Sequence, residues 1–135
     1  VAMEDEDIAR AIARATRAVD RDLAFLAVAR SALEQAGATE GLEVVSEVFA
    51  DRAYDDRGLL VARSEEGAVL HDCAEAADRV LAMVSESALI AMSGLRIPAP
   101  IHSICVHGDT PNAVKMASAV RQKLEAAGVT VKAFG

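Results

Sequence analysis

A strand, a tight turn and a helix follow one another in residues 101–124, which read IHSICVHGDTPNAVKMASAVRQKL. The apolar run from Ile101 to Val106 predicts a buried strand, and Gly108 marks the turn after it. Thr110 as N-cap and Pro111 as first helical residue predict the start of a helix. Such a unit is typical of α/β proteins, in which strands alternate with helices.

The same alternation runs through the rest of the chain. Apolar residues spaced three to four apart predict further helices in residues 4–19, 29–36 and 72–84. Apolar runs predict further strands at 23–28, 43–50 and 129–134, the first of them buried on both faces. The order α-β-α-β-α-β-α-β predicts an α/β fold with a parallel sheet, built as a single domain over residues 1–135.

Glycines and caps predict where these elements end. Gly37 is expected to cap the second helix, and Asp72 to cap the start of the third. Residues 51–66 form a polar loop that is long enough to be functional, with turns at Gly58 and Gly67. Residues 93–100 are expected to form a plain connector.

Composition excludes several classes of partner. Hydrophobic residues make up 53% of the chain and charged ones 26%, which is typical of a folded domain. The 21 acidic and 14 basic residues give a net charge of −7, which argues against nucleic acid or an anionic membrane as partner. The sequence has no apolar run that could cross a bilayer, so a soluble cytoplasmic protein is expected. Cys73 and Cys105 form no disulfide framework, and no metal site or Walker A motif is predicted.

The end of the strand at 43–50 carries an unusual set of charges. Glu47 and Asp51 lie on the same side because side chains alternate along a strand. A carboxylate inside an apolar strand is costly unless it is paired or used, and Arg52 is the nearest candidate partner. A structural Glu47–Arg52 ion pair and a catalytic role for Glu47 are equally open on this pattern.

His107 occupies the corresponding place at the end of the strand at 101–106. It follows the strand directly and precedes a helix N-terminus, where free N–H groups favour an anion. An imidazole there could act as a general acid or base near neutral pH. The alternative is a turn in which Asp109 and Thr110 only cap the helix. The remaining candidate residues are expected to have structural roles only. His71 and His102 are expected on the surface and Cys105 in the core. Residues 54–57 are expected to form a solvated turn rather than a lid.

Two long motifs together resemble the LamB/YcsF family. They are SEVFADRAY at 46–54, followed by Gly58 and LVARS at 60–64, and ICVHGDTP at 104–111. The resemblance covers nearly the whole chain, although Asn112 replaces a commonly small residue after the Thr-Pro pair. Family members look about twice as long, and their upstream His-Pro-Gly and Lys-Pro-His-Gly-Ala-Leu-Tyr-Asn segments have no counterpart here. The chain is therefore expected to be the C-terminal half of a family member.

The resemblance implies a fold and a function. The fold would be part of a distorted seven-stranded β/α barrel of the glycoside hydrolase/deacetylase type. The activity would be that of the A subunit of 5-oxoprolinase, which opens 5-oxo-L-proline to L-glutamate with ATP and works with B and C subunits. Glu47, His107 and Asp109 would be catalytic, and Arg52 and Asp51 would bind substrate. The half-length chain is expected to be inactive alone and to form a homo-oligomer. The alternative is a non-catalytic fragment or interaction module.

Overall fold

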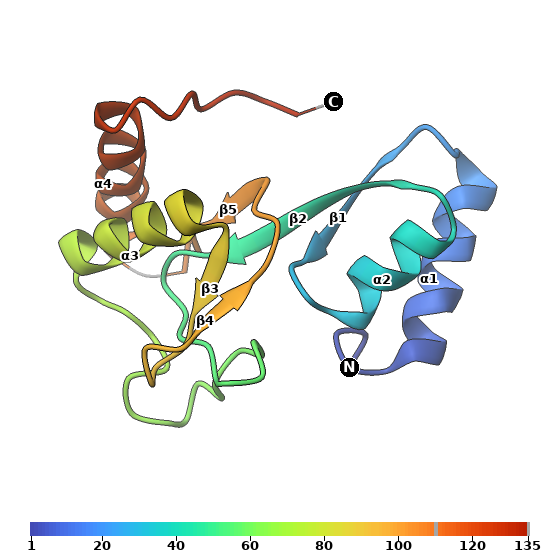
Figure 1. The fold of residues 1–135 in the computed structure, drawn as a ribbon, viewed down its shortest axis with the longest axis horizontal. Coiled ribbons are helices and arrows are strands. Elements are labelled where there is room, and N and C mark those ends of the chain that lie inside the picture. The colour runs from blue at the N-terminus through green and yellow to red at the C-terminus, as the bar shows by residue number, and fades with distance from the viewer. Residues whose placement is uncertain (110, 135) are drawn as a thin grey trace. The chain divides into compact units, whose positions relative to one another are not determined.

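The computed structural model describes residues 1–109 and 111–134. Helices and strands alternate over the first five elements, as predicted (Figure 1). The elements are α1 (Glu6–Val19), β1 (Ala24–Val28), α2 (Ala32–Thr39), β2 (Glu43–Phe49), α3 (Cys73–Glu86), β3 (Ala88–Ile90), β4 (Arg96–Pro98), β5 (Ser103–Cys105) and α4 (Ala113–Ala126). None of the helices in this described part is both long and apolar enough to span a membrane.

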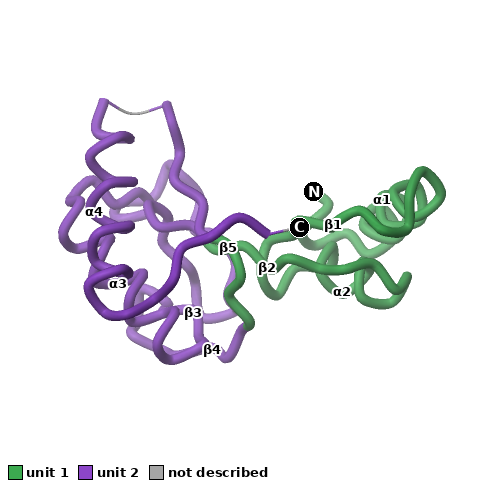
Figure 2. Tube along the Cα trace, turned by 90° about the horizontal axis from the view of Figure 1, so that it is seen from above, with its two compact units in different colours: residues 1–48, 100–103 green, residues 49–99, 104–135 purple. Residues whose placement is uncertain are grey.

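The chain divides into two compact units, drawn in different colours in Figure 2. The first contains residues 1–48 and 100–103, and the second contains residues 49–99 and 104–135. Strands β2 and β5 are neighbours in a sheet of order β1-β2-β5, and the division falls within both of them.

The first unit is a strand pair covered by two helices. Strands β1 and β2 are parallel, with Phe25 opposite Val44 and Ala27 opposite Ser46. Phe25 and Ala27 lie on one face and pack with alanines from both helices, in a core of Ala9, Ala13, Phe25, Ala27, Ala36 and Leu42. The parallel sheet and the α/β class predicted from the sequence are therefore confirmed.

The expectation that β1 is buried on both faces is wrong. Its burial alternates, and Leu26 on the uncovered face is 45% exposed. The reason lies in the helices, because α1 and α2 share a single core with Phe25 and Ala27. An apolar run alone does not show whether helices cover one or both faces of a strand.

The predicted end of the second helix at Gly37 is also wrong. Helix α2 continues through Gly37 to Thr39. A side chain at this position would place Cβ only 2.5 Å from Cδ1 of Phe25, so glycine is needed there for close packing of the helix on β1. The left-handed turn after the helix falls at Gly41, with φ of 74°.

The predicted cap of α3 is confirmed, because the Asp72 carboxylate accepts hydrogen bonds from the backbone N–H groups of Ala74 and Glu75. The connector predicted for residues 93–100 is wrong, since β4 pairs antiparallel with β3. A left-handed Ser87 ends α3, and Gly94, with φ of 88°, turns the chain back. Pro98 is tolerated because a two-stranded sheet consists of edge strands.

The C-terminal part of the second unit departs from prediction at the start of its helix and in the segment that follows the helix. Helix α4 begins at Ala113, two residues after Pro111, and the predicted Thr110 cap lies outside the described residues. Gly128 ends the helix with φ of 83°, as predicted. Residues 129–134 were expected to form a strand, but they form none. A strand needs a hydrogen-bonded neighbouring strand, and no described strand pairs with this segment.

Candidate functional site

The chain leaves β2 into a loop that is more ordered than its polar sequence indicates. Ala53, Val61 and Ala68 pack into a small core with Leu70. Backbone hydrogen bonds close the loop on itself, from Ala53 N to Ala68 O and from Leu70 N to Asp51 O, both 2.9 Å long. Gly58 and Gly67 adopt positive φ at the two predicted turns. Side chains at either end of this loop are therefore held in defined positions.

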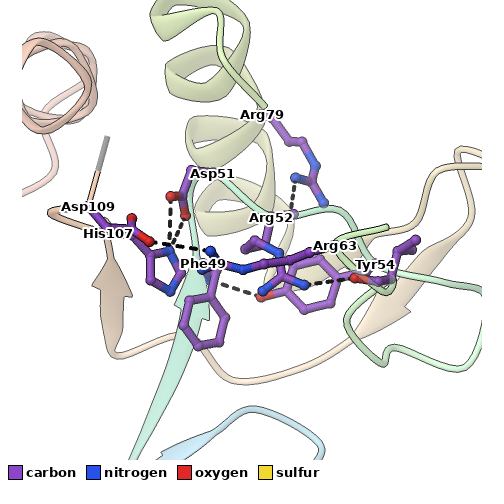
Figure 3. A network of polar contacts seen from close by, with 9 residues as sticks. Phe49, Asp51, Arg52, Tyr54, Arg63, Arg79, His107 and Asp109 are labelled. Carbon is purple, nitrogen blue, oxygen red and sulfur yellow. Dashed lines mark hydrogen bonds and ion pairs between the residues drawn. The ribbon is translucent and has the colours of Figure 1, made fainter. Parts of the chain in front are cut away.

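Asp51 and His107 meet at the carboxyl ends of β2 and β5 (Figure 3). The backbone N–H of Ala50 donates to Cys105 O over 2.9 Å, which brings the two strand ends together. His107 Nδ1 then lies 2.8 and 2.9 Å from the two carboxylate oxygens of Asp51. An ionised carboxylate only accepts, so Nδ1 carries the proton and Nε2 is left as the basic nitrogen. The Asp51 side chain is 8% exposed and that of His107 25%.

Phe49 and Tyr54 fix the orientation of this pair. The Phe49 ring stacks on the His107 imidazole, with centroids 5.2 Å apart and planes 6° from parallel. The backbone N–H of Phe49 donates to the buried Tyr54 hydroxyl over 2.8 Å. His107 is thus restrained by a hydrogen bond in its plane and by a ring against its face. A small pocket beside it is lined by Asp51, Val69, Leu70, His71, Val106, His107, Pro111, Asn112 and Met116.

Arg52 lies deep in the loop and is only 9% exposed. Its Nη2 donates to Val61 O over 2.7 Å, and its buried Nε has no partner among the described residues. The Nε donor of Arg52 could therefore take a further acceptor while Nη2 keeps its contact with Val61. Its predicted substrate-binding role stays a prediction.

Arg79 of α3 supports the loop from the other side, which the sequence did not indicate. Its guanidinium donates to Arg52 O over 2.7 Å and to Ile90 O over 2.9 Å. It also lies 5.4 Å from the centroid of the Tyr54 ring, a cation–π distance. Burial lowers the pKa of Arg79, while Tyr54 and Glu75 raise it in part. Arg79 therefore ties the start of the loop to α3 and β3.

Asp109 pairs with a residue that sequence reasoning missed, Arg63. Arg63 Nη1 lies 3.3 Å from Asp109 Oδ2, and the two side chains are 54% and 58% exposed. The hydrogen bond from Arg63 holds the pKa of Asp109 below its ordinary value. Both residues lie in motifs that carry the family resemblance, but the partners are 46 residues apart, so no local pattern indicated that they pair.

Glu47 belongs to the first unit, and its carboxylate accepts a hydrogen bond from the Ser103 hydroxyl over 3.1 Å. This contact satisfies a half-buried carboxylate in an otherwise apolar strand. Glu47 and Arg52 belong to different units, and each has a partner within its own unit. The catalytic roles predicted for Glu47, His107 and Asp109 stay predictions.

Comparison with known proteins agrees with this arrangement of motifs. The LamB/YcsF family matches residues 1–135. The chain belongs to the LamB/YcsF family. It is 50% identical over 134 residues to the 5-oxoprolinase A subunit of Rhodopseudomonas palustris strain BisB18, covering 99% of this chain and 52% of that protein. It is 52% identical over 126 residues to the 5-oxoprolinase A subunit of Mycolicibacterium paratuberculosis, covering 93% of this chain and 50% of that protein.

A solved structure supports the fold. The crystal structure of the lactam utilization protein from Thermus thermophilus matches with a TM-score of 0.87 at 41% identity, covering 98% of this chain and 53% of that chain. This chain spans about half the length of the relatives it matches. The resemblance to LamB/YcsF drawn from the two motifs is confirmed, and the fold agrees with part of a larger LamB/YcsF protein.

Within this LamB/YcsF chain, the second unit brings together three of the five residues predicted for the site. Asp51 and His107 touch, and Asp109 follows His107 by two residues. Among the described residues, no cluster of His, Cys, Asp and Glu could hold a metal ion. The arrangement supplies a restrained, partly exposed imidazole beside a pocket, with an exposed ion pair at the next turn.

Proposed function

We propose that this chain forms the part of a 5-oxoprolinase A subunit that opens 5-oxo-L-proline hydrolytically to L-glutamate, with ATP hydrolysis. The names of its relatives support the reaction. The observation that carries the proposal is the contact of His107 Nδ1 with Asp51 at 2.8 and 2.9 Å, beside a pocket. Hydrolysis of a lactam needs two proton transfers, one away from the attacking water and one to the lactam nitrogen. A histidine can accept and then donate a proton near neutral pH.

His107 acts as general base and then as general acid. Its Nε2 takes a proton from a water molecule as the water oxygen bonds to the lactam carbonyl carbon. The same proton passes to the lactam nitrogen as the C–N bond breaks, which leaves a carboxyl group and an amine. Asp51 acts through His107, because its carboxylate holds the Nδ1–H tautomer and stabilises the imidazolium. Asp51 is thus a positioning residue in this proposal rather than a substrate ligand.

ATP, the B and C subunits and a cytoplasmic setting belong to the same proposal. The sequence has no Walker A motif, so we assign no residue of this chain to the nucleotide and derive no step through it. Glu47 and Asp109 remain candidates for orienting substrate or water in the complete site. Arg52 remains a candidate for a substrate contact other than the carboxylate.

The test uses a completed subunit. This chain is joined to the half of the Rhodopseudomonas palustris protein that it does not match, and is assayed with the B and C subunits of that organism. We expect glutamate to form in the presence of 5-oxoproline and ATP. His107→Gln should lower kcat by about 100-fold or more, the usual scale of a general acid–base group.

His102→Gln is the matched control, since His102 Nδ1 accepts a hydrogen bond from Ser46 N in the first unit and has no place in the proposed chemistry. Glutamate formation that is equal in the His107 and His102 variants would contradict the proposal.

A further inference from the structure

A carboxylate substrate that enters the pocket beside His107 meets the carboxylate of Asp51, which lines that pocket, and needs a cation to balance its charge. Asp109 lies two residues beyond His107 and is exposed. Two arginines of the second unit, buried Arg52 and half-buried Arg79, are held by backbone carbonyls. Arg52 donates to Val61 O, and Arg79 donates to Arg52 O and Ile90 O. The guanidinium of Arg63 differs from both, because its side chain is 54% exposed and its partner is an exposed carboxylate at the His107 turn.

We propose that Arg63 binds the carboxylate of the substrate, exchanging its contact with Asp109 for the incoming anion. This inference rests on the proposed function, and it names the group that would select an acidic lactam over a neutral one. An exposed ion pair contributes little to stability, so giving up Asp109 costs the protein little. A guanidinium offers two parallel N–H donors that match a carboxylate.

The loop is built so that Arg63 reaches this turn. Arg52 Nη2 holds the carbonyl of Val61, two residues before Arg63, and Val61 N donates to Ala53 O over 3.0 Å. Glu65 N donates to Ala62 O over 2.9 Å on the other side of Arg63. Figure 3 shows the Arg63 side chain extended from the loop toward Asp109. Buried Arg52 therefore positions the segment that presents Arg63.

The turn between His107 and Asp109 is exposed. A Cβ added at Gly108 would meet no heavy atom within 4 Å. A carboxylate that replaces Asp109 on Arg63 would thus lie beside open space, next to the residue that moves the proton. Binding and chemistry would be supplied by neighbouring but separate groups, Arg63 and His107.

The experiment measures binding and turnover separately in the completed subunit with its B and C partners. L-5-oxoproline and its neutral amide, 5-oxoprolinamide, are titrated by calorimetry, and steady-state kinetics are measured with the acid. Arg63→Gln should weaken binding of the acid and raise its KM by about 10- to 100-fold, the scale of a lost charge-assisted contact. It should leave kcat within a few-fold and leave binding of the amide unchanged.

Arg121→Gln is the matched control. Arg121 is also an exposed arginine in an ion pair, with Glu125 at 2.9 Å on α4, and its loss should change neither ligand's binding. Arg63→Lys keeps the charge but loses the two-pronged geometry, so it should fall between wild type and Arg63→Gln.

The outcomes separate this inference from the proposed function. Turnover with a KM that does not depend on Arg63, or an equal loss for acid and amide, overturns the role of Arg63 alone. Binding of the acid that depends on Arg63 without any glutamate formation supports the carboxylate site and overturns the proposed reaction. Failure of 5-oxoproline to bind the completed wild-type protein overturns both.

Discussion

The contact between Asp51 and His107 gives the sharpest prediction for a single residue. Asp51→Asn replaces an acceptor with an amide that can turn its NH₂ toward Nδ1, so the imidazole proton would move to Nε2, where the base is needed. We expect kcat in the completed subunit to fall by about 100-fold or more while KM changes little. The measurement is steady-state kinetics over a range of pH.

Asp78→Asn is the control for this substitution. Asp78 is an exposed carboxylate that pairs with Lys123 between α3 and α4, away from the proposed chemistry. The two variants should differ in kcat and agree in thermal stability to within a few degrees. An Asp51→Asn enzyme with wild-type kcat would show that the carboxylate only stabilises the loop.

A second residue-scale prediction concerns the charge of Asp109. The hydrogen bond from Arg63 is the main cause of its lowered pKa, followed by a hydrogen bond from the backbone N–H of Asp109 and by the charges of Arg63 and His107. Arg63→Gln should therefore move the pKa of Asp109 up toward its ordinary value of 3.8. Carboxyl ¹³C NMR across an acid titration measures this directly.

Because the pKa of Asp109 is lowered, the direction in which pH affects this ion pair follows. A carboxylate whose pKa is lowered on folding stabilises the folded state above its unfolded pKa, and this contribution is lost as the pH falls through the folded value. The Arg63–Asp109 contact should thus be present at neutral pH and lost in acid. An unchanged pKa in Arg63→Gln would mean that the two side chains do not pair in solution.

Sequence reasoning found His107 and Asp51 because polar groups at the ends of apolar strands are unusual. It missed that they touch, since they are 56 residues apart and meet only through the pairing of β2 and β5. The family resemblance assigned substrate binding to Arg52, and the sequence could not show that this side chain is buried and donates to Val61 O.

At the scale of elements, the substitution Gly37→Ala tests which of two effects is larger: the higher helix propensity of alanine or the steric cost of its Cβ. Alanine favours a helix interior by about 1 kcal/mol over glycine. The added Cβ would lie 2.5 Å from Phe25 Cδ1 and 2.9 Å from Val44 Cγ2, however, and overpacking typically costs about 1–3 kcal/mol. We expect Gly37→Ala to destabilise the chain, measured as a lower midpoint in urea unfolding. A higher midpoint would mean that Phe25 and Val44 move aside without cost.

Local signals predicted the helices better than the strands. Asp5, Ser31 and Asp72 each accept a backbone N–H at a helix start, a cap that can be recognised within a few residues of sequence. The β3–β4 hairpin and the absence of a strand at 129–134 depend instead on which segments find partners. That information is not local, so short apolar runs could not decide it.

At the scale of the whole molecule, apolar side chains at β1 are exposed to solvent. In the order β1-β2-β5, β1 lies at one end of the sheet among the described residues. Leu23 and Leu26 beside or within it are exposed. Exposed strand edges and apolar patches favour pairing with another chain. Relatives about twice as long carry a further half that could supply such a partner.

We therefore expect the purified 135-residue chain either to form oligomers or to have a low Tm. We also expect it to show no 5-oxoprolinase turnover alone. Adding the unmatched half of the Rhodopseudomonas palustris protein should convert it to a one-to-one complex with a higher Tm. Light scattering and thermal unfolding, with and without that half, are the measurements.

Leu26→Lys should weaken the complex because it charges the uncovered face of β1, whereas Val114→Lys on exposed α4 should not. A compact monomer that unfolds cooperatively, with a mass and a Tm that do not change when the other half is added, would show that the uncovered face of β1 needs no partner.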